Sequence, residues 1–261
     1  MWDRPVSSTE VRESYEQFFP LSPLYPSYKP DRLKVQVWNI WHGGRRFGKQ
    51  VGVNRVIEVL KRENADVIGL IETYGSGAII ADSLGYYFYL ISSNLSIMSR
   101  YPIDETIQLF RSFNSGGALI RISEEQQIAF YDIWLHYLPD VSDLNKGKAA
   151  VKKYEEDEAQ TRIPEIREIL KQMAPRTAQS AETPVILVGD FNCDSHLDWN
   201  EQARPAHLGA FAKLEVSRQV LNEGFTDSFR HLYPDVLLNQ GATWSPLINL
   251  GSKKLSCLPQ R

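Results

Sequence analysis

Cysteine is scarce in this chain, with two residues, Cys193 and Cys257, among 261. Two cysteines cannot build a disulfide framework, and their spacing matches no zinc-binding pattern. This scarcity excludes a disulfide-rich scaffold, while a single bridge between the two thiols stays open.

Long apolar runs are also missing. A membrane-spanning helix needs roughly 18 to 20 apolar residues in succession, and no stretch of the sequence approaches that length. Residues 1–5 lack the basic and then apolar pattern of a secretion signal. We therefore expect a soluble protein without an export signal, with the cytoplasm as its default location.

A large excess of one charge is absent too, since 29 lysines and arginines face 32 aspartates and glutamates, for a formal net charge of -3. This balance argues against a strongly basic surface for nucleic acid, although a local basic cleft needs only a few well-placed cations. The hydrophobic content of 43% is ordinary for a globular protein and supports a sizeable core, in one large domain or two small ones.

Proline is concentrated near the N-terminus. Four prolines fall between positions 20 and 30, a density that favours an extended, semi-rigid connector. We interpret residues 1–31 as a proline-rich linker or surface strap. Residues 32–246 would form the folded domain, and residues 247–261 an irregular tail without a strand pattern.

The domain opens with a strand–helix–strand pattern. Residues 33–41 alternate between apolar and polar side chains, as a strand with one buried face does. Residues 67–71 form an apolar run typical of a strand buried on both faces. Asn54 is expected to cap the helix between these two strands.

Short segments rich in β-branched and aromatic residues fill the middle of the domain and predict further strands. Turn-forming residues separate them, and their closeness favours antiparallel pairing and therefore mixed sheets. These predicted strands cover residues 86–91, 95–98, 117–122 and 127–135.

A long helical stretch follows over residues 146–173, where Pro164 is expected to kink or break the helix. The acidic run over residues 155–158 is interpreted as a solvated face of that helix. The remaining predicted elements are a polar loop over residues 175–183, a strand over residues 185–188 and a last helix over residues 214–221.

The strand over residues 185–188 is followed at once by two polar side chains, Asp190 and Asn192. We expect this apolar strand to be buried on both faces, with Gly189 allowing the backbone to turn after it. A carboxylate and an amide at the end of a buried strand cost free energy unless they bind something. The carboxyl ends of strands are also where α/β sheets usually place their chemistry. An Asx turn that merely closes the strand is the alternative.

Three other predicted strands also end in polar groups, at Asn39, Glu72 and His136. Taken alone, Asn39 could be a turn residue, Glu72 a surface carboxylate and His136 a core histidine. Together with Asp190 they form a set suited to metal-assisted hydrolysis. Mg²⁺ prefers oxygen ligands, which suits Glu72 and the amide oxygen of Asn39. Asp190 suits orienting or deprotonating a water, and His136 and Asn192 suit donating to a phosphate.

Six motifs occur in order: WNIW (38–41), GLIET (69–73), IMSRYPI (97–103), DIWLHY (132–137), GDFN (189–192) and TWSP (243–246). The ordered set resembles the endonuclease/exonuclease/phosphatase superfamily, whose members are DNase I-like, over about residues 32–246. The resemblance implies an α/β fold, a four-layer α/β/β/α sandwich of two mixed β-sheets with the site at one end. It also implies a metal-dependent phosphodiesterase, a nuclease-like hydrolase that uses Mg²⁺ or alternatively Mn²⁺. The substrate would be a phosphate ester: a nucleic acid, a lipid or a small molecule.

The resemblance also assigns roles to residues by their positions in these motifs. The implied metal-site residues are Asn39 and Glu72, and the implied catalytic residues are His136, Asp190 and Asn192. Three further residues are candidates for substrate binding: Arg100 could flank a phosphate, His196 lies just beyond GDFN, and Trp244 could stack on a base or sugar.

The chain departs from the family beyond TWSP. Family members continue into a strand that carries an aspartate and then end in a Ser-Asp-His segment, which occurs nowhere in this sequence. We therefore expect the C-terminal strands of the sandwich to be missing. The alternative to a working enzyme is a truncated, catalytically impaired family member that acts as a binding module. A lipid or inositol phosphate ester is the alternative substrate, and the sequence leaves the oligomeric state open.

Overall fold

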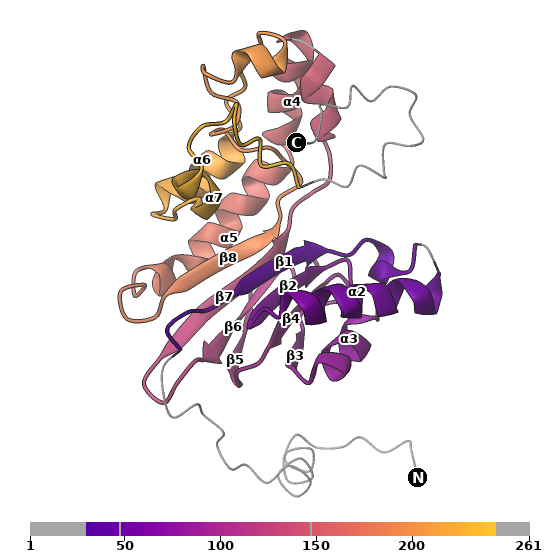
Figure 1. The fold of residues 1–261 in the computed structure, drawn as a ribbon. Coiled ribbons are helices and arrows are strands. Elements are labelled where there is room, and N and C mark those ends of the chain that lie inside the picture. The colour runs from indigo at the N-terminus through magenta and orange to yellow at the C-terminus, as the bar shows by residue number, and fades with distance from the viewer. Residues whose placement is uncertain (1–29, 47, 147, 244–261) are drawn as a thin grey trace, which may run out of the picture. The chain divides into compact units, whose positions relative to one another are not determined.

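The computed structural model describes residues 30–46, 48–146 and 148–243, which belong to two compact units (Figure 1). Among the described residues, unit one contains residues 30–137 together with Pro164–Asn192, and unit two contains Leu138–Ile163 and residues 193–243. The predicted strap lies outside the described residues except for Pro30 and Asp31, and the predicted tail over residues 247–261 lies wholly outside them.

Unit one holds two mixed sheets of four strands each. Sheet A has the order β1-β2-β4-β3, with β1 at Val35–Asn39, β2 at Val67–Ile71, β4 at Leu95–Ser99 and β3 at Tyr87–Leu90. Strands β1 and β2 run parallel because helix α2 (Lys49–Glu63) crosses between them. Strand β4 pairs antiparallel with both β2 and β3.

Sheet B repeats this mixture of antiparallel and parallel pairs. Its order is β5-β6-β7-β8, with β5 at Ile103–Gln108, β6 at Ser115–Arg121, β7 at Gln127–Trp134 and β8 at Val185–Asp190. Strands β5, β6 and β7 form an antiparallel meander. Strand β8 runs parallel to β7, in a register that places Asp190 beside Trp134.

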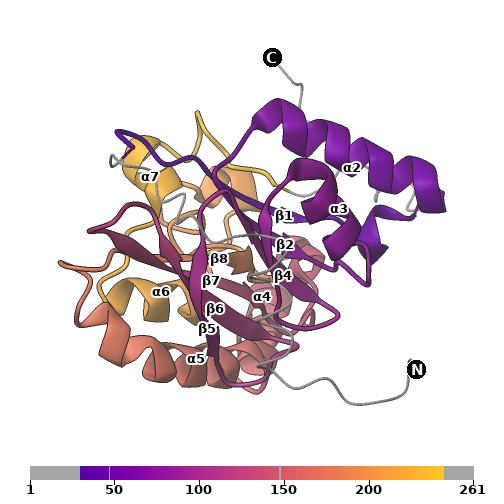
Figure 2. The same ribbon diagram turned by 90° about the horizontal axis from the view of Figure 1, so that it is seen from below.

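The sheets pack face to face between two layers of helices (Figure 2). Helices α2 and α3 (Gly77–Leu84) cover the outer face of sheet A, where Leu60 and Ile80 pack in one cluster with Ile68 and Met98. Helix α5 (Arg162–Thr177) covers the outer face of sheet B with buried apolar side chains such as Ile169. The predicted α/β fold of two mixed β-sheets is confirmed.

The space between the two sheets is filled by apolar side chains. Strand β1 faces β8, β2 faces β7, β4 faces β6 and β3 faces β5. Val67 and Ile97 of sheet A pack in one buried cluster with Ala118 and Phe130 of sheet B. Each such side chain stabilises the fold by about 1.5–3 kcal/mol relative to leaving it in water, so this layer fixes the two sheets against each other.

Strands β1 and β8 lie at the edges of their sheets among the described residues. Every residue of β8 is half-buried, so the expectation of a strand buried on both faces is wrong for residues 185–188. The reason is that β8 is paired on one side only in the described part of the chain. The same expectation is confirmed for β2, a central strand in which all residues are buried.

Some local expectations fail because the structure places element boundaries differently. Helix α2 begins after Gly48, so Asn54 does not cap it; its Oδ1 instead accepts from Gln50 Nε2 at 2.9 Å within the helix. Strand β5 and helix α3 were not expected. The sequence of β5, IDETIQ, is mostly polar and largely exposed, and α3 starts at a glycine without a side-chain cap.

The predicted long helix is two helices, α4 (Lys148–Glu158) and α5. The break falls at residues 159–161, before Pro164, which lies in the first turn of α5 where its missing N–H is tolerated. Helix α5 also continues through Pro175, so part of the expected loop over residues 175–183 is helical.

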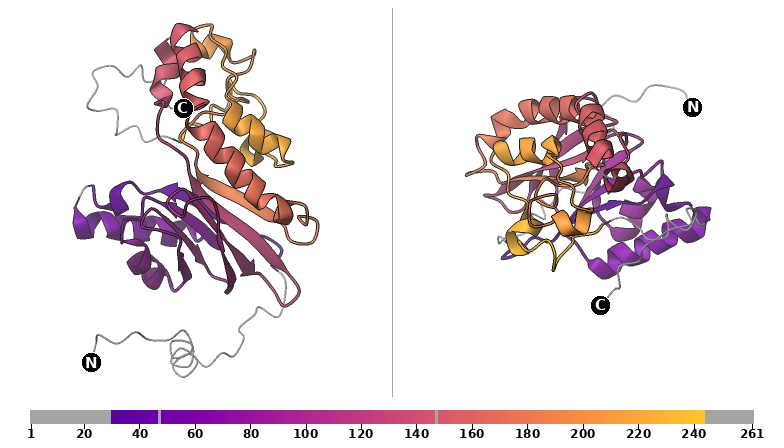
Figure 3. Two further views of the ribbon diagram at one scale, coloured as in Figure 1. Left: turned by 180° about the vertical axis from the view of Figure 1, so that it is seen from behind. Right: turned by 90° about the horizontal axis from the view of Figure 1, so that it is seen from above.

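Unit two is built from helices and loops, without strands among its described residues (Figure 3). It contains α4, α6 (Glu215–Asn222), α7 (Ser228–Leu232) and the short 3-10 helices η2 (Val141–Lys146) and η3 (Arg204–His207). The predicted last helix is α6, and α7 follows it. No helix in the described parts of the chain is long and apolar enough to cross a bilayer.

A buried ion pair organises unit two. Glu158 is 1% exposed and pairs with Arg162 at 3.1 Å, so the expected solvated face is wrong at this position. Arg162 also donates to the carbonyl of Pro139 at 3.0 Å and to the hydroxyl of Tyr154 at 2.6 Å. Burial raises the pKa of Glu158 and the pKa of the Tyr154 phenol. These hydrogen bonds compensate part of the cost of burying the charges.

A carboxyl group is also buried between the sheets of unit one. Asp132 of β7 is 0% exposed, and neither of its carboxyl oxygens has a hydrogen-bond partner among the described residues. A Cβ at Gly69 of β2 would lie 3.0 Å from the Asp132 carboxyl carbon, so the glycine leaves the room that this carboxyl occupies. Burial raises the pKa of Asp132 well above its usual range, and the nearby carboxylate of Asp190 adds to the rise.

Substituting Asp132 tests this assignment. Because the folded state keeps this proton while the unfolded chain releases it above its ordinary pKa of 3.8, the wild type loses stability as pH rises. We expect the free energy of unfolding of Asp132→Asn, measured by urea at pH 5 to 8, to gain on the wild type by about 1.4 kcal/mol per pH unit, up to the folded-state pKa. Asp82→Asn, at an exposed position on α3, should show no such trend. Parallel curves for Asp132→Asn and the wild type would contradict the assignment.

Candidate active site

The carboxyl ends of β1, β2 and β8 meet in unit one, where Asn39 joins two carboxylates. The Asn39 Nδ2 donates to Glu72 Oε1 at 3.0 Å and to Asp190 Oδ2 at 2.9 Å. The three residues are far apart in the sequence, and Asp190 belongs to the other sheet. The structure therefore brings three of the predicted site residues into direct contact.

The orientation of the Asn39 amide follows from its second partner. Its Oδ1 accepts from the backbone N–H of Trp41 at 2.9 Å, which leaves the nitrogen facing the carboxylates. A carbonyl oxygen has two lone pairs, and one of them is used here. The predicted metal role of Asn39 therefore depends on the second lone pair of Oδ1.

Glu72 is fixed through both its backbone and its side chain. Its N–H donates to Asn94 Oδ1 at 3.2 Å, and its Oε2 accepts from the N–H of His42 at 3.1 Å. Its φ of 57° lies in the left-handed region, which costs free energy for a residue with a Cβ. Such strain persists only where the surrounding contacts impose it, and the hydrogen bonds of Glu72 supply those contacts.

The loop after β1 docks closely on the loop after β2. Four successive residues, Trp41 to Gly44, have positive φ values. A Cβ on Gly43 would lie 2.8 Å from the carbonyl oxygen of Thr73, so this position requires glycine. The N–H of Gly43 donates to the carbonyl of Glu72 at 2.7 Å. This close approach positions His42 to donate to the Glu72 carboxylate.

Asp190 ends β8 in an Asx turn. Its Oδ1 accepts from the N–H of Asn192 at 2.9 Å, while Oδ2 accepts from Asn39. The Asn192 Nδ2 donates to the carbonyl of Leu135 at 2.8 Å, which ties the turn to the end of β7. The Asx turn therefore also orients the Asp190 carboxylate, so that its second oxygen lies toward Asn39.

His136 lies two residues beyond the paired positions Trp134 and Asp190, at the same end of sheet B. Its backbone N–H donates to Glu165 Oε2 of α5 at 2.8 Å. Its ring stacks on Tyr137 with centroids 5.1 Å apart and an interplanar angle of 18°. His136 therefore lies at the end of sheet B that carries Asp190, and its catalytic role stays a prediction.

Arg100, a predicted substrate contact, does not lie with these residues. It follows Ser99, which pairs with Val67 at the start of β2, so it lies at the opposite end of sheet A from Glu72. Its guanidinium group lies 3.5 Å from Asp66 there. The antiparallel direction of β4 is what places Arg100 away from the site.

Of the other two predicted substrate contacts, the structure describes only His196. His196 belongs to unit two, where its Nδ1 and its backbone N–H both lie 2.8 Å from the hydroxyl of Ser217. Burial, followed by the charge of Arg218, lowers the pKa of its imidazole. Trp244 lies outside the described residues.

The donor set at the strand ends fits a divalent cation that prefers oxygen. Glu72 and Asp190 form no ion pair with any described residue, so two negative charges converge without a compensating cation. Carboxylate and amide oxygens suit Mg²⁺ or Mn²⁺. The described residues contain no group of three or more His, Cys, Asp or Glu that could hold a metal. Water and phosphate oxygens would therefore complete the coordination, as is usual for Mg²⁺.

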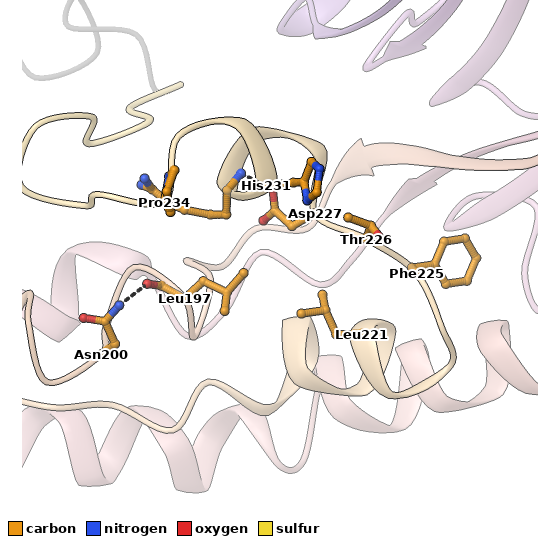
Figure 4. A pocket seen from close by; sticks show the side chains of 9 residues that line it. Leu197, Asn200, Leu221, Phe225, Thr226, Asp227, His231 and Pro234 are labelled. Atoms are coloured by element: carbon orange, nitrogen blue, oxygen red, sulfur yellow. Dashed lines mark hydrogen bonds between the residues drawn. The ribbon is translucent and has the colours of Figure 1, made fainter.

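A cavity in unit two is lined by none of the predicted site residues. It has a volume of about 350 Å³, and its lining includes Leu197, Leu221 and Asn200 (Figure 4). Two of its polar side chains already have partners: Asn200 donates to the carbonyl of Leu197 at 2.8 Å, the dashed line in Figure 4, and Asp227 accepts from the N–H of Arg230 at 2.9 Å.

Comparisons with known proteins agree with this fold. The profile of the Endonuclease/Exonuclease/phosphatase family matches residues 37–247, a family of phosphoesterase hydrolases. The chain belongs to this family, which confirms the resemblance seen in its motifs.

Individual relatives are distant. The uncharacterized protein F14F9.5 of Caenorhabditis elegans is 26% identical over 223 residues, which cover 82% of this chain and 70% of that protein. An AP endonuclease from Archaeoglobus fulgidus is 13% identical with a TM-score of 0.51, over 78% of this chain and 76% of the other. A truncated Caenorhabditis elegans TDP2 is 16% identical with a TM-score of 0.44, over 61% and 62%. The structural similarity to the endonuclease supports the fold.

Two asparagines of the site were missed by sequence reasoning. Asn94 links the backbone of Glu72 to the carbonyl of Phe113, to which its Nδ2 donates at 3.0 Å. Asn114 donates to the carbonyl of Trp134 at 3.0 Å and accepts from its N–H at 2.8 Å. Both asparagines lie in segments that read as turns, where asparagine is common, so their pattern carried no distinguishing signal.

The bridge formed by Asn39 can be tested by its removal. We expect Asn39→Ala to lower the free energy of unfolding at pH 7 in EDTA by about 1.5–3 kcal/mol, because two hydrogen bonds to charged groups are lost and the carboxylates repel each other. Urea denaturation measures the change. The matched control, Asn54→Ala at an exposed position of α2, should cost well under half of that. Equal losses in the two variants would refute the bridge.

Proposed function

We propose that this chain is a Mg²⁺-dependent phosphoesterase that hydrolyses phosphodiester bonds by in-line attack of a water. The proposal is carried by one observation, the Asn39 bridge between Glu72 and Asp190. Two carboxylates that converge without a cationic partner at the ends of sheet strands favour a bound divalent cation.

Glu72 and the Oδ1 of Asn39 would hold the metal, and Mn²⁺ would use the same donors. When bound, the metal supplies Lewis-acid stabilisation of the charge that grows on the phosphoryl oxygens. The hydrogen bond from His42 leaves Glu72 one fixed orientation. That fixed orientation reduces the rearrangement needed when the site is loaded.

Asp190 would orient the attacking water and accept its proton. As the new P–O bond forms, the water O–H bond breaks and the proton passes to Asp190. The P–O bond to the leaving oxygen breaks with its electron pair, and that oxygen takes a proton from solvent. We assign His136 and Asn192 to donate hydrogen bonds to the phosphoryl oxygens, where they stabilise the developing negative charge.

Substitution of Glu72 tests the metal site. We expect Glu72→Gln to lower the rate of bis(4-nitrophenyl) phosphate hydrolysis by at least about 100-fold and to abolish the rise in Tm that Mg²⁺ causes, because a metal-ligating charge is lost. Glu58→Gln, an exposed position on α2, is the matched control and should keep both properties. A full Mg²⁺ response in Glu72→Gln would rule out Glu72 as a ligand.

Substitution of Asp190 separates the water-orienting role from metal binding. Asp190→Asn keeps an oxygen for one of the two hydrogen bonds that Asp190 accepts but cannot accept the proton, so we expect kcat to fall by about 100- to 10,000-fold. The Mg²⁺ concentration that gives half the maximal rise in Tm should change little. If the wild type hydrolyses no phosphodiester with either Mg²⁺ or Mn²⁺, the proposal fails, and the binding-module alternative takes its place.

A further inference from the structure

Two clusters of aromatic side chains border the candidate site in unit one, and the proposed chemistry uses neither. Cluster one consists of Trp41, His42 and Tyr74, on the loops after β1 and β2. Cluster two consists of Phe113, Trp134 and Tyr137, on the loop before β6 and at the end of β7. One cluster belongs to sheet A and the other to sheet B, so they flank the Asn39 bridge between the sheets.

Cluster one is attached directly to the site. The N–H of Trp41 donates to Asn39, and the N–H of His42 donates to Glu72. The rings of His42 and Tyr74 are stacked, with centroids 6.3 Å apart. The guanidinium group of Arg46 lies 4.8 Å from the centroid of the Trp41 ring. This cluster therefore presents flat rings and a cation next to the Glu72 carboxylate.

Cluster two has a similar composition at the other side of the bridge. Phe113 and Trp134 pack edge to face with centroids 5.6 Å apart, and Tyr137 lies 6.4 Å from Trp134. Arg111 lies 4.8 Å from the centroid of the Phe110 ring in the same loop. Trp134 is beside Asp190 in the register of β7 and β8, which places this cluster at the site as well.

Each cluster has aromatic side chains that are open to solvent. Tyr74 is 36% exposed, Phe113 41% and Tyr137 58%. Exposed aromatic surface costs free energy, and grouped exposure on one face is typical of a binding surface. The backbone of Tyr74 is also in the left-handed region, with a φ of 38°, held there by a hydrogen bond of 2.8 Å from Arg45 to its carbonyl. The protein thus keeps these aromatic rings exposed, and the Tyr74 backbone in the left-handed region, although both features cost free energy.

We infer that the two clusters are base-stacking subsites on either side of the scissile phosphate, and that the substrate is a single-stranded nucleic acid. This inference rests on the proposed phosphodiesterase function. Every base has a flat π-face, and stacking on an aromatic ring contributes about 1–3 kcal/mol per base. In a duplex those faces are already stacked on neighbouring bases, so only an unpaired strand can offer them to both clusters.

The charges near the clusters favour nucleic acid over a lipid surface. Each nucleotide offers a flat base next to a phosphate, which matches a ring next to an arginine, as in the pairs Trp41 with Arg46 and Phe110 with Arg111. A lipid also carries a phosphate, but its alkyl chains have no flat π-face to stack on an aromatic ring. The overall charge of -3 is no obstacle, because the few cations required are local.

The inference is tested by measuring the binding of nucleic acid without a metal ion, so that no strand is cleaved. In EDTA, fluorescence anisotropy would compare a labelled ten-nucleotide oligothymidylate, an abasic strand of equal length and charge, and a blunt-ended duplex of two separate strands. We expect the oligothymidylate to bind at least 10-fold more tightly than either of the others, because only it offers unpaired bases.

Variants in each cluster locate the binding. Tyr74→Ala and Tyr137→Ala should each weaken oligothymidylate binding about 5- to 100-fold and leave binding of the abasic strand unchanged. Tyr74→Phe keeps the ring and should keep the affinity, which also guards against loss of folding. The control, Tyr87→Ala, removes a 41% exposed tyrosine on β3, which pairs with Ser99 at the opposite end of sheet A, and should have no effect.

Three results would overturn the inference: an abasic strand or a duplex that binds as tightly as the oligothymidylate, Ala variants that bind it normally, or vesicles of sphingomyelin and phosphatidylcholine that displace it. Hydrolysis of bis(4-nitrophenyl) phosphate by the wild type tests the proposed function separately. If the protein hydrolyses bis(4-nitrophenyl) phosphate but binds strands without preference for bases, the base-stacking subsites are refuted and the proposed phosphoesterase function stands. If it binds in a base-dependent way but hydrolyses nothing, the subsites are supported and the proposed function is refuted.

Discussion

A single amide side chain sets the geometry at one end of unit one. The two N–H groups of Asn39 reach Glu72 on its own sheet and Asp190 on the facing sheet. Both bonds can form only where the sheets hold one position against each other, which the apolar layer between them provides. Hydrogen bonds to charged groups are stronger than neutral ones. The bridge therefore fixes the separation of two carboxylates that Coulomb repulsion would otherwise push apart.

Three other asparagines connect the loops at this end of unit one by hydrogen bonds. Asn94 joins the backbone of Glu72 to the loop before β6, Asn114 joins that loop to β7, and Asn192 joins the turn after β8 to β7. An amide can donate and accept at once, so one side chain satisfies groups on two segments. The left-handed backbone of Glu72 is stable because this network imposes it.

Several features that cost free energy lie in unit one near this end. The strained loop after β1, the exposed ring of Tyr137, and the buried carboxyl of Asp132 beneath Asp190 each break a rule that an ordinary core or surface obeys. Local departures of this kind are expected where a protein is organised for chemistry rather than for stability. The ion pair of Arg162 in unit two differs, since its hydrogen bonds are satisfied within the protein.

The sequence by itself determined the family, the central strand β2 and the set of strand-end side chains, because apolar runs and short motifs are local patterns. The features that depend on the pairing of distant segments were decided by the tertiary structure alone. The antiparallel direction of β4 sends Arg100 away from the site, although it lies in a family-like motif. The edge position of β8 leaves it half-buried. The Asn39 amide turns its nitrogen to the carboxylates because Trp41 donates to its oxygen. Strand order, direction and hydrogen-bond partners arise between distant segments, and no local pattern encodes them.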